Sequence, residues 1–455
     1  MKHTDIIQKL NLEQKCALLS GETVFTTRAL PGKGIPAITL SDGPNGVRKQ
    51  AGAADHLGLN PSVPATCFPT SSATACSWDE KLGEAVGEAL GEEAAAQEVA
   101  VLLGPGLNIQ RSPLCGRDFE YFSEDPILAG RMAAAYVRGI QKNGISACPK
   151  HFAVNSQELR RMASDSVLDE RTLRELYLTG FEIVVKEAKP KTIMTSYNLI
   201  NGTYANENAH LLQDILRKDW GFDGAVVTDW GGSNDHALGV KNGSTLEMPC
   251  PGGDSIRELM KAVQDGKISE ADVDARLDEM LELVLSTHAA VEKAPRTFDA
   301  AAHHKLARRA AAESIVLLRN EGGILPLKPN EKLAVIGDFA ETPRYQGAGS
   351  SAVNALQVDT LLNSIKADDS GITFVGYASG FERQGAVDAE KLEEAVALAK
   401  KADTVLLCLG LDELRESEGL DRSDMKLAEN QQQLLAAVAA VNPNVVVLLS
   451  AGAPV

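Results

Sequence analysis

Two acidic residues at the ends of apolar segments are the side chains of this sequence best suited to chemistry. Asp229 follows the apolar run Ala225–Val227 and precedes Trp-Gly-Gly, while Glu418 lies in the charged stretch Arg-Glu-Ser-Glu-Gly. Cleavage of a glycosidic bond needs one carboxyl group as nucleophile or base and a second as acid, and the two need not be neighbours in sequence. Each residue also has a simpler interpretation, because Asp229 could cap a helix and Glu418 could be a solvated loop charge.

A second group of polar residues lies at the ends of other short apolar runs or in the polar stretches that follow them, and it contains both signs of charge. Sugar hydroxyls both donate and accept hydrogen bonds, so carboxylates beside Lys, Arg and His suit a sugar. A phosphate would instead favour cations without the Asp residue. For each of the charged residues alone, a salt bridge within the protein explains the sequence equally well. The group consists of Asp42, Arg48, Arg117, Lys150, His151, Arg161 and Tyr197.

Lys150 permits a different chemistry, since a lysine at a strand end could form a Schiff base in a barrel aldolase. Nucleotide binding has little support. The glycine-rich stretch Gly347–Ser351 continues with Ala-Val-Asn, and no Walker or dinucleotide-binding glycine pattern opens a helix.

The elements that must position these residues alternate between short strands and amphipathic helices. Alternation of this kind produces a parallel sheet, and over about 290 residues it favours a (β/α)8-type barrel with its site at the carboxyl ends of the strands. Ser77 and Glu80 form a predicted capping box for a helix that ends near Gln97, and apolar spacing predicts helices around 173–185 and 211–216. The predicted strands are Ile35–Leu40, Val99–Leu103, Ile145–Cys148, Thr192–Ser196 and Ala225–Val227.

A second α/β domain is predicted after a linker at 289–312. We therefore divide the chain into 1–288, the linker, and a sandwich domain at 313–455. Its predicted strands and helices are Ile315–Leu318, Leu333–Gly337, Ala389–Lys401, Thr404–Leu409, Met425–Ala440 and Val445–Leu449. The chain stops six residues after the last strand, so we expect this domain to be truncated, and the 455-residue chain alone to be aggregation-prone and poorly active.

Composition excludes several classes of protein. The chain has 455 residues with 45 Lys and Arg against 62 Asp and Glu, a net charge of −17. A protein of this net charge lacks the basic surface of a nucleic-acid binder. No apolar run in the sequence approaches the ~18 residues that a membrane-spanning helix needs. Seven scattered cysteines without a Cys-x-x-Cys pair predict neither a zinc site nor a disulfide framework, and together with the polar N-terminus they favour a cytoplasmic location.

Four ordered motifs resemble the β-glucosidases of glycoside hydrolase family 3. They begin at Ser41, Gly116, Lys150 and Thr228 and read Ser-Asp-Gly-Pro-Asn-Gly-Val-Arg, Gly-Arg-Asp-Phe-Glu-Tyr-Phe-Ser-Glu-Asp-Pro, Lys-His-Phe-Ala-Val-Asn-Ser-Gln and Thr-Asp-Trp. The resemblance implies a barrel-like domain and an α/β sandwich with the active site between them. It also implies retaining, exo-acting hydrolysis of β-linked sugars without a metal or another cofactor.

The resemblance implies a role for individual residues. Asp229 matches the nucleophile, and Glu418 matches the acid/base in the loop that usually reads Trp-Glu-Ser/Thr-Glu-Gly, with Arg415 here in place of the Trp. In a retaining enzyme the two carboxyls approach to ~5–5.5 Å. The implied sugar-binding positions are Asp42, Arg48, Arg117, Lys150, His151, Arg161, Tyr197, Trp230 and Ser350, with Ser351 as an alternative to Ser350.

Alternatives remain at this stage. A β-xylosidase would keep most of these residues, whereas a β-N-acetylglucosaminidase of the family typically carries an Asp/His pair in a short barrel loop that this sequence lacks. A truncated, non-catalytic sugar-binding protein is the alternative from another class. A homo-oligomer, or a partner chain that completes the second domain, is also open.

Overall fold

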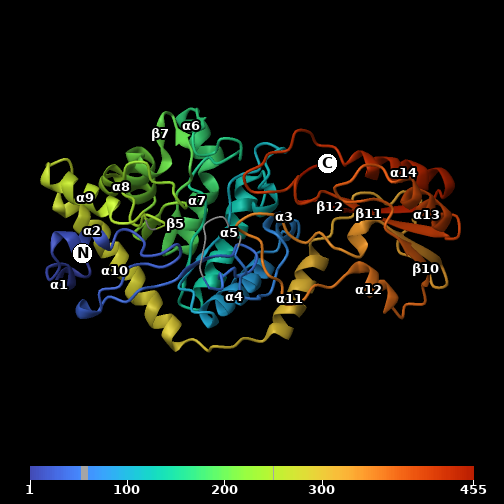
Figure 1. Cartoon of the computed structure of the whole chain (residues 1–455), viewed down its shortest axis with the longest axis horizontal. Coiled ribbons are helices and arrows are strands. Elements are labelled where there is room, and N and C mark those ends of the chain that lie inside the picture. The colour runs from blue at the N-terminus through green and yellow to red at the C-terminus, as the bar shows by residue number, and fades with distance from the viewer. Residues whose placement is uncertain (53–59, 250) are drawn as a thin grey trace.

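The computed structural model describes residues 1–52, 60–249 and 251–455. Its buried apolar side chains form two clusters. The larger runs from Ile7 to Val353, and the smaller lies between Leu333 and Val438. Figure 1 shows the corresponding two domains side by side, with the N-terminus in the first and the C-terminus in the second. The chain therefore has the expected two-domain α/β organisation.

The strands of the first domain are shorter than the sequence predicts. One sheet has the parallel order β1-β2-β3, and its strands are Leu40–Asp42, Val101–Leu103 and Ser146–Ala147. A second sheet pairs β5 (Thr192–Met194) with β8 (Ala225–Val227). The prediction of a strand at Ile35–Leu40 is wrong except at Leu40, because residues 35–39 make only isolated antiparallel bridges. The expected eight-stranded barrel is seen here as two parallel sheets linked by single bridges, among them Phe152 with Thr195 and Val227 with Leu246.

Two long helices pack against each other beside the first sheet. They are α4 (Glu80–Ala96) and α5 (Pro126–Gln141). A Cβ on Gly87 would lie 2.4 Å from Tyr136 O, and one on Gly139 would lie 2.2 Å from Glu84 O. Only glycine permits such contact between two backbones. The predicted capping box at the start of α4 is wrong. The Asp79 side chain accepts from the N–H groups of Lys81 and Leu82, while Ser77 Oγ donates to Thr74 O.

The predicted helical face at 173–185 is buried except at Leu176 and Tyr177, which are half-buried, and that at 211–216 is buried as expected. The first lies in a continuous but irregular helix made of α6 (Glu170–Thr172), a wide turn at Leu173–Tyr177, α7 (Thr179–Ile183) and a second wide turn at Val184–Ala188. The second lies in the wide helix His210–Asp219. Gly221 follows it with a φ of 75° and donates to Arg217 O. This is the left-handed ending that glycine favours.

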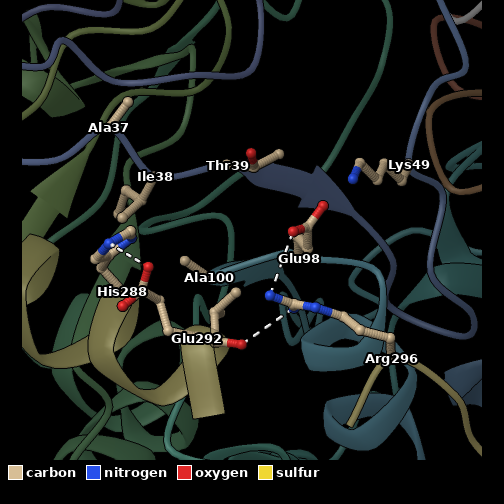
Figure 2. A pocket seen from close by; sticks show the side chains of 10 residues that line it. Ala37, Ile38, Thr39, Lys49, Glu98, Ala100, His288, Glu292 and Arg296 are labelled. Carbon is tan, nitrogen blue, oxygen red and sulfur yellow. Dashed lines mark hydrogen bonds and ion pairs between the residues drawn. The ribbon is translucent and has the colours of Figure 1, made fainter. Parts of the chain in front are cut away.

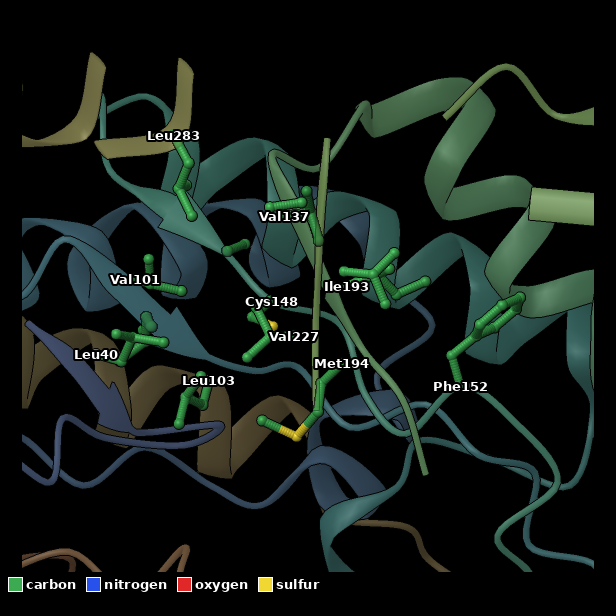
Figure 3. Close-up of a cluster of buried hydrophobic side chains, with 14 of the residues drawn as sticks. Leu40, Val101, Leu103, Val137, Cys148, Phe152, Ile193, Met194, Val227 and Leu283 are labelled. Carbon is green, nitrogen blue, oxygen red and sulfur yellow. The ribbon is translucent and has the colours of Figure 1, made fainter. Parts of the chain in front are cut away.

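The core of the first domain lies where the two sheets meet these helices. Figure 3 shows Leu40, Val101, Cys148, Met194 and Val227 from five strand segments gathered in one apolar layer. Phe152 extends the layer by edge-on contacts with Phe181 and Trp220, at centroid distances of 5.2 and 5.8 Å. The polar residues that follow each strand are thereby fixed at one end of this layer. The remaining elements of the domain are α1 (Thr4–Ile7), α2 (Leu12–Ala17), α3 (Ser71–Ala75), β4 (Asp165–Ser166), β6 (Leu199–Ile200), β7 (Thr203–Tyr204), α8 (His236–Asn242), α9 (Asp254–Gln264) and α10 (Glu270–Lys293).

The second domain is a parallel sheet in the order β10-β9-β11-β12. Three of its strands were predicted, and β10 was not, since Gly376 interrupts its apolar pattern. The two outer strands of this order are β10 and β12, and on β12 Val447 and Leu449 are exposed. That further chain covers this strand stays a prediction. The elements are β9 (Lys332–Ile336), α12 (Leu361–Lys366), β10 (Thr373–Ala378), α13 (Ala389–Ala399), β11 (Thr404–Gly410), α14 (Glu429–Val441) and β12 (Val445–Ser450).

The segment that we predict as a linker is largely helical, and a strand predicted directly after it is absent from the structure. Residues 289–312 contain the end of α10 and most of α11 (Ala300–Glu313), which buries Ala307 and Ala310 in the core of the first domain. The predicted strand Ile315–Leu318 is wrong, since these residues form no strand and all four side chains are exposed. An apolar run becomes a strand only beside another strand that can accept its backbone hydrogen bonds. The sheet of the second domain, as described, does not include this run.

None of the helices in the described residues combines the length and the apolar character that a membrane crossing needs. The six cysteines in the described part of the chain are all free, and Cys250 lies outside that part.

Candidate active site

Asp229 lies two residues beyond the end of β8 and is 9% exposed. Its Oδ1 accepts from the Trp230 N–H at 2.8 Å, which holds the carboxylate in one orientation. Its Oδ2 is buried without a hydrogen-bond partner among the described residues, and the nearest basic atom is His151 Nε2 at 3.6 Å. Burial raises the pKa of this carboxyl, and Arg117 and Arg161 oppose the rise. One carboxylate oxygen is therefore fixed and the other is free to react.

Two aromatic residues and a neutral histidine surround this carboxylate. Tyr197 donates its hydroxyl to Trp230 O at 2.8 Å, and Trp230 donates its ring N–H to Val24 O at 2.7 Å. His151 Nδ1 lies 3.1 Å from the Tyr121 hydroxyl. Burial and the nearby Arg and Lys side chains hold the pKa of His151 well below its usual value. His151 is therefore uncharged and suited to hydrogen bonding with a neutral ligand.

Arg117 and Lys150 share a carboxylate that the sequence analysis did not select. Arg117 makes a bidentate contact with Glu120, at 2.8 Å from Nε and 3.0 Å from Nη2. Lys150 Nζ lies 3.1 Å from the same carboxylate, and all three side chains are buried. The pKa of Lys150 is raised by this and other carboxylates against the effect of burial. A Schiff-base lysine needs an uncharged amine, so this environment does not favour the aldolase interpretation.

Glu418 reaches the same cluster from the second domain. Its Oε1 lies 2.8 Å from Arg161 Nη1 and 3.7 Å from Arg117 Nη1. Its Oε2 accepts from the Ser350 N–H at 2.8 Å. Although burial opposes it, the two guanidinium groups and the Ser350 contact hold the pKa of this carboxyl far below its usual range. In the ligand-free protein Glu418 is therefore a carboxylate.

Arg48 and Ser350 connect the loop at 347–351 to the first domain and to Glu418. Arg48 Nη1 donates to Ser350 O at 3.0 Å and to Gly349 O at 3.4 Å. Ser350 thus contacts both Arg48 and Glu418 through its backbone. Asp42 lies at the end of β1, and burial raises its pKa to about 6, with Lys150 opposing the rise.

Close contacts hold the loop that carries Glu418 against Gly116 of the first domain and against Gly349 of the second. A Cβ on Gly116 would lie 1.7 Å from Leu420 O and 2.4 Å from Ser417 O. Gly349 has a φ of 122°, and a Cβ there would lie 2.4 Å from Glu418 Cβ. Glycine is required at both positions because the loop that carries Glu418 lies directly against them.

Three acidic residues of the site were missed by the sequence analysis. Glu120 binds Arg117 and Lys150, Glu158 binds Arg161 at 2.8 Å, and Asp421 accepts from backbone N–H groups of the first domain. Glu120 lies inside a motif already noted, and Glu158 directly follows another. For Glu120 and Glu158 this closeness to the motifs was the available signal, whereas nothing in the sequence marked Asp421.

A cavity of about 270 Å³ lies elsewhere in the first domain. Figure 2 shows it lined by Ile38, Ala100, His288, Glu292 and Arg296, with Arg296 paired to Glu98. These residues belong to α10, to the chain just after it and to the segments that precede β1 and β2, whereas Asp42 ends β1 and Asp229 follows β8. The cavity is therefore at the opposite end of the sheets from the carboxylates.

The arrangement brings together two carboxylates from different domains, four cations and hydrogen-bonding aromatic residues. All nine residues predicted for substrate binding lie in or against this cluster. Within the described residues, no group of three or more His, Cys, Asp or Glu side chains could hold a metal ion. The arrangement can bind a polyhydroxylated neutral ligand and place one carboxylate from each domain on it.

Comparison with known proteins gives a consistent result. Residues 53–283 match the N-terminal domain of glycosyl hydrolase family 3, and residues 315–455 match the C-terminal domain of the same family. The chain is 46% identical over 453 residues to the thermostable beta-glucosidase B of Acetivibrio thermocellus, covering 99% of the chain and 60% of that relative. It is 44% identical over 457 residues to an exo-alpha-(1->6)-L-arabinopyranosidase of Bifidobacterium longum, covering 98% of the chain and 60% of that relative.

Solved structures agree with the fold. The GH3 beta-glucosidase of Bifidobacterium adolescentis superposes with a TM-score of 0.92 at 43% identity, covering 99% of this chain and 64% of that chain. Beta-glucosidase 3B of Thermotoga neapolitana in complex with alpha-D-glucose superposes with a TM-score of 0.89 at 33% identity, covering 100% of this chain and 70% of that chain. The chain spans about three fifths of the length of the two curated relatives named above.

Proposed function

The chain belongs to glycosyl hydrolase family 3, and on that basis we propose that it is a retaining, exo-acting β-glucosidase. The observation that carries the proposal is the pair formed by Asp229 and Glu418. The first lies at the end of β8 in one domain, and the second is held beside the same two arginines from the other domain. Two carboxyls on opposite sides of a sugar site are what glycoside hydrolysis requires.

In the proposed mechanism Asp229 attacks the anomeric carbon with Oδ2 while Glu418 protonates the glycosidic oxygen. A covalent glycosyl-enzyme forms and the aglycone leaves. Glu418, now a carboxylate, takes a proton from water, and that water displaces Asp229 from the sugar. The fixed Oδ1 of Asp229 supports this direction of attack, because only the other oxygen is without a partner among the described residues.

The ligand-free ionisation of Glu418 fits the second of these steps directly. The first step needs a protonated carboxyl, yet Arg161 and Arg117 lower the pKa of Glu418. We propose that a bound sugar takes over hydrogen bonds of Arg161 and excludes water from the carboxyl. Both effects raise the pKa of an acid, as catalytic acids require.

The proposed sugar contacts are the side chains that surround the carboxylates and can still donate or accept. Neutral His151 and the charged groups of Arg117, Lys150 and Arg161 fit sugar hydroxyls, and Trp230 offers an apolar face. Arg48 and Ser350 have a second proposed role, since their mutual contact holds the loop at 347–351 against the first domain. Arg415 bonds Lys426 O at 3.0 Å, which stabilises the Glu418 loop from its outer end.

We also propose that the first domain is a distorted (β/α)8-type barrel. The parallel pairs β1-β2-β3 and β5-β8, with the single bridges at Phe152, Val227 and Ser20, support a ring of parallel segments. The division into 1–288, 289–312 and 313–455, a cytoplasmic location, and a homo-oligomer or partner chain all stay predictions.

Initial rates on a small panel of aryl glycosides test the proposed substrate. The panel holds β-glucoside, β-xyloside, N-acetyl-β-glucosaminide and α-L-arabinopyranoside, the last because one 44% identical relative carries that activity in its name. We expect the highest kcat/KM on the β-glucoside, measured on the protein at its natural length. A preference for the xyloside or the arabinopyranoside would mean that the natural substrate carries a pentose, which lacks the hydroxymethyl group of glucose. Binding of glucose without turnover of any member would favour the non-catalytic alternative.

A further inference from the structure

Asp421 lies three residues after Glu418 and crosses from the second domain to the first. Its Oδ1 accepts from the N–H of Gly116 at 3.1 Å and of Glu158 at 3.0 Å. Its Oδ2 accepts from the N–H of Glu158 at 3.1 Å and of Leu159 at 2.9 Å. One carboxylate thus binds two separate loops of the first domain.

Glu158 makes the reciprocal contact. Its Oε2 accepts from the N–H of Gly419, in the second domain, at 2.8 Å. The same oxygen lies 2.8 Å from Arg161 Nη1, and that nitrogen lies 2.8 Å from Glu418 Oε1. Each domain therefore supplies a carboxylate to the backbone of the other, and we refer to these two residues as the Asp421–Glu158 pair.

The pair holds the chain on the C-terminal side of Glu418. Gly419 is bound from the first domain, and Asp421 ties the chain two residues later to the loop that contains Gly116. That loop touches Ser417 and Leu420 so closely that it has no room for a Cβ at position 116. Glu158 itself is 3% exposed, so water competes little for its contacts. Hydrogen bonds to a carboxylate are about twice as strong as neutral ones.

We propose that Asp421 and Glu158 are positioning residues that hold Glu418 where it can protonate the leaving group. This inference rests on the proposed role of Glu418 as acid/base. Neither residue is required for attack by Asp229, which is fixed by its own backbone contact at the end of β8. Since a displacement of about 1 Å can lower a rate by about a hundredfold, loss of the pair should affect proton transfer more than nucleophilic attack.

The test compares leaving groups in Asp421→Asn and wild type, at natural length and with aryl glycosides of the sugar that the protein cleaves. Asn keeps the size of the side chain but loses the charge and one acceptor oxygen. We expect kcat/KM on the phenyl glycoside to fall by about tenfold to a hundredfold, with little change on the 2,4-dinitrophenyl glycoside, whose leaving group needs no proton. The matched control is Asp388→Asn, because Asp388 also accepts from two backbone N–H groups, but only within the second domain. It should leave both substrates unaffected.

An equal fall on both substrates, or no fall on either, would overturn the positioning role. If Asp421→Asn does not fold, as judged by thermal unfolding, Glu158→Gln removes charge from the other half of the pair and must give the same leaving-group pattern. Glu418→Ala, measured in the same series, separates the two failures. If Glu418→Ala loses kcat/KM equally on both substrates, the proposed role of Glu418 as the acid is overturned. If Glu418→Ala loses more on the phenyl glycoside but Asp421→Asn does not, only the positioning role of Asp421 is overturned.

Discussion

The carboxylate of Glu418 in the second domain lies 2.8 Å from the guanidinium of Arg161 in the first. Both side chains are largely buried, so the contact is shielded from solvent and more effective than a surface ion pair. This ion pair joins the two domains beside the candidate nucleophile, since Arg161 also acts on the carboxyl of Asp229. Substitution of a site residue in either domain should therefore impair one catalytic step more than the other, and the affected step identifies the role of that residue.

We expect Asp229→Ala to lose several orders of magnitude in turnover, because the covalent route is lost with its nucleophile. A 2-deoxy-2-fluoro glycoside with a good leaving group should label the wild-type protein on Asp229, as read by mass spectrometry of the labelled peptide. Asp214→Asn, a change on the exposed face of the helix His210–Asp219, is the control and should label normally. Label on another residue of an active preparation would refute the assignment.

We expect Glu418→Ala to lower kcat/KM by about a hundredfold to ten-thousandfold on substrates with poor leaving groups, and far less on activated phenols. Azide should restore turnover of the activated substrates and yield a β-glycosyl azide, because a small anion can occupy the space of the missing carboxylate. The product is identified by NMR. An α-glycosyl azide, or equal losses on both kinds of substrate, would count against Glu418 as the acid/base.

We expect Gly116→Ala to reduce activity by about tenfold or more, since its Cβ would collide with Leu420 O and Ser417 O and displace the Glu418 loop. The loss should again be greater for poor leaving groups. Gly32→Ala is the matched control, because a Cβ there meets no atom within 4 Å. Wild-type kinetics in Gly116→Ala would show that the domains separate more easily than this contact implies.

We expect Asp118 to make the protein less stable as the pH rises. Asp118 is buried, and burial, with a contribution from Glu416, raises its pKa from 3.8 to about 8. Between these two values the folded protein holds a proton that the unfolded chain releases, so the free energy of unfolding falls as pH rises, by at most about 1.4 kcal/mol per pH unit.

Urea unfolding of Asp118→Asn across this pH range should remove that slope relative to wild type. Asp169→Asn is the control, because hydrogen bonds from Thr172 lower the pKa of the Asp169 carboxyl and keep it ionised throughout the window. Parallel slopes for wild type and Asp118→Asn would show that Asp118 does not hold the proton.

The family, the two-domain α/β organisation and the residues at the strand ends were all predictable from the sequence. Asp229 and Lys150 stand directly after apolar runs, and the periodicity of Leu211, Leu212, Ile215 and Leu216 marks a buried face. Such local patterns depend only on residues a few positions apart, so they can be recognised without knowing how the rest of the chain folds.

Contacts between residues far apart in the chain were decided by the tertiary structure alone. The apolar run Ile315–Leu318 forms no strand because strand formation needs a partner, and Glu120, Glu158 and Asp421 resemble ordinary surface charges until buried cations and backbone N–H groups of distant segments meet them. The ionisation of Glu418 has the same origin. The charges that lower its pKa most, Arg117 and Arg161, are about 300 and 257 residues away in the chain and act by Coulomb attraction across the domain contact.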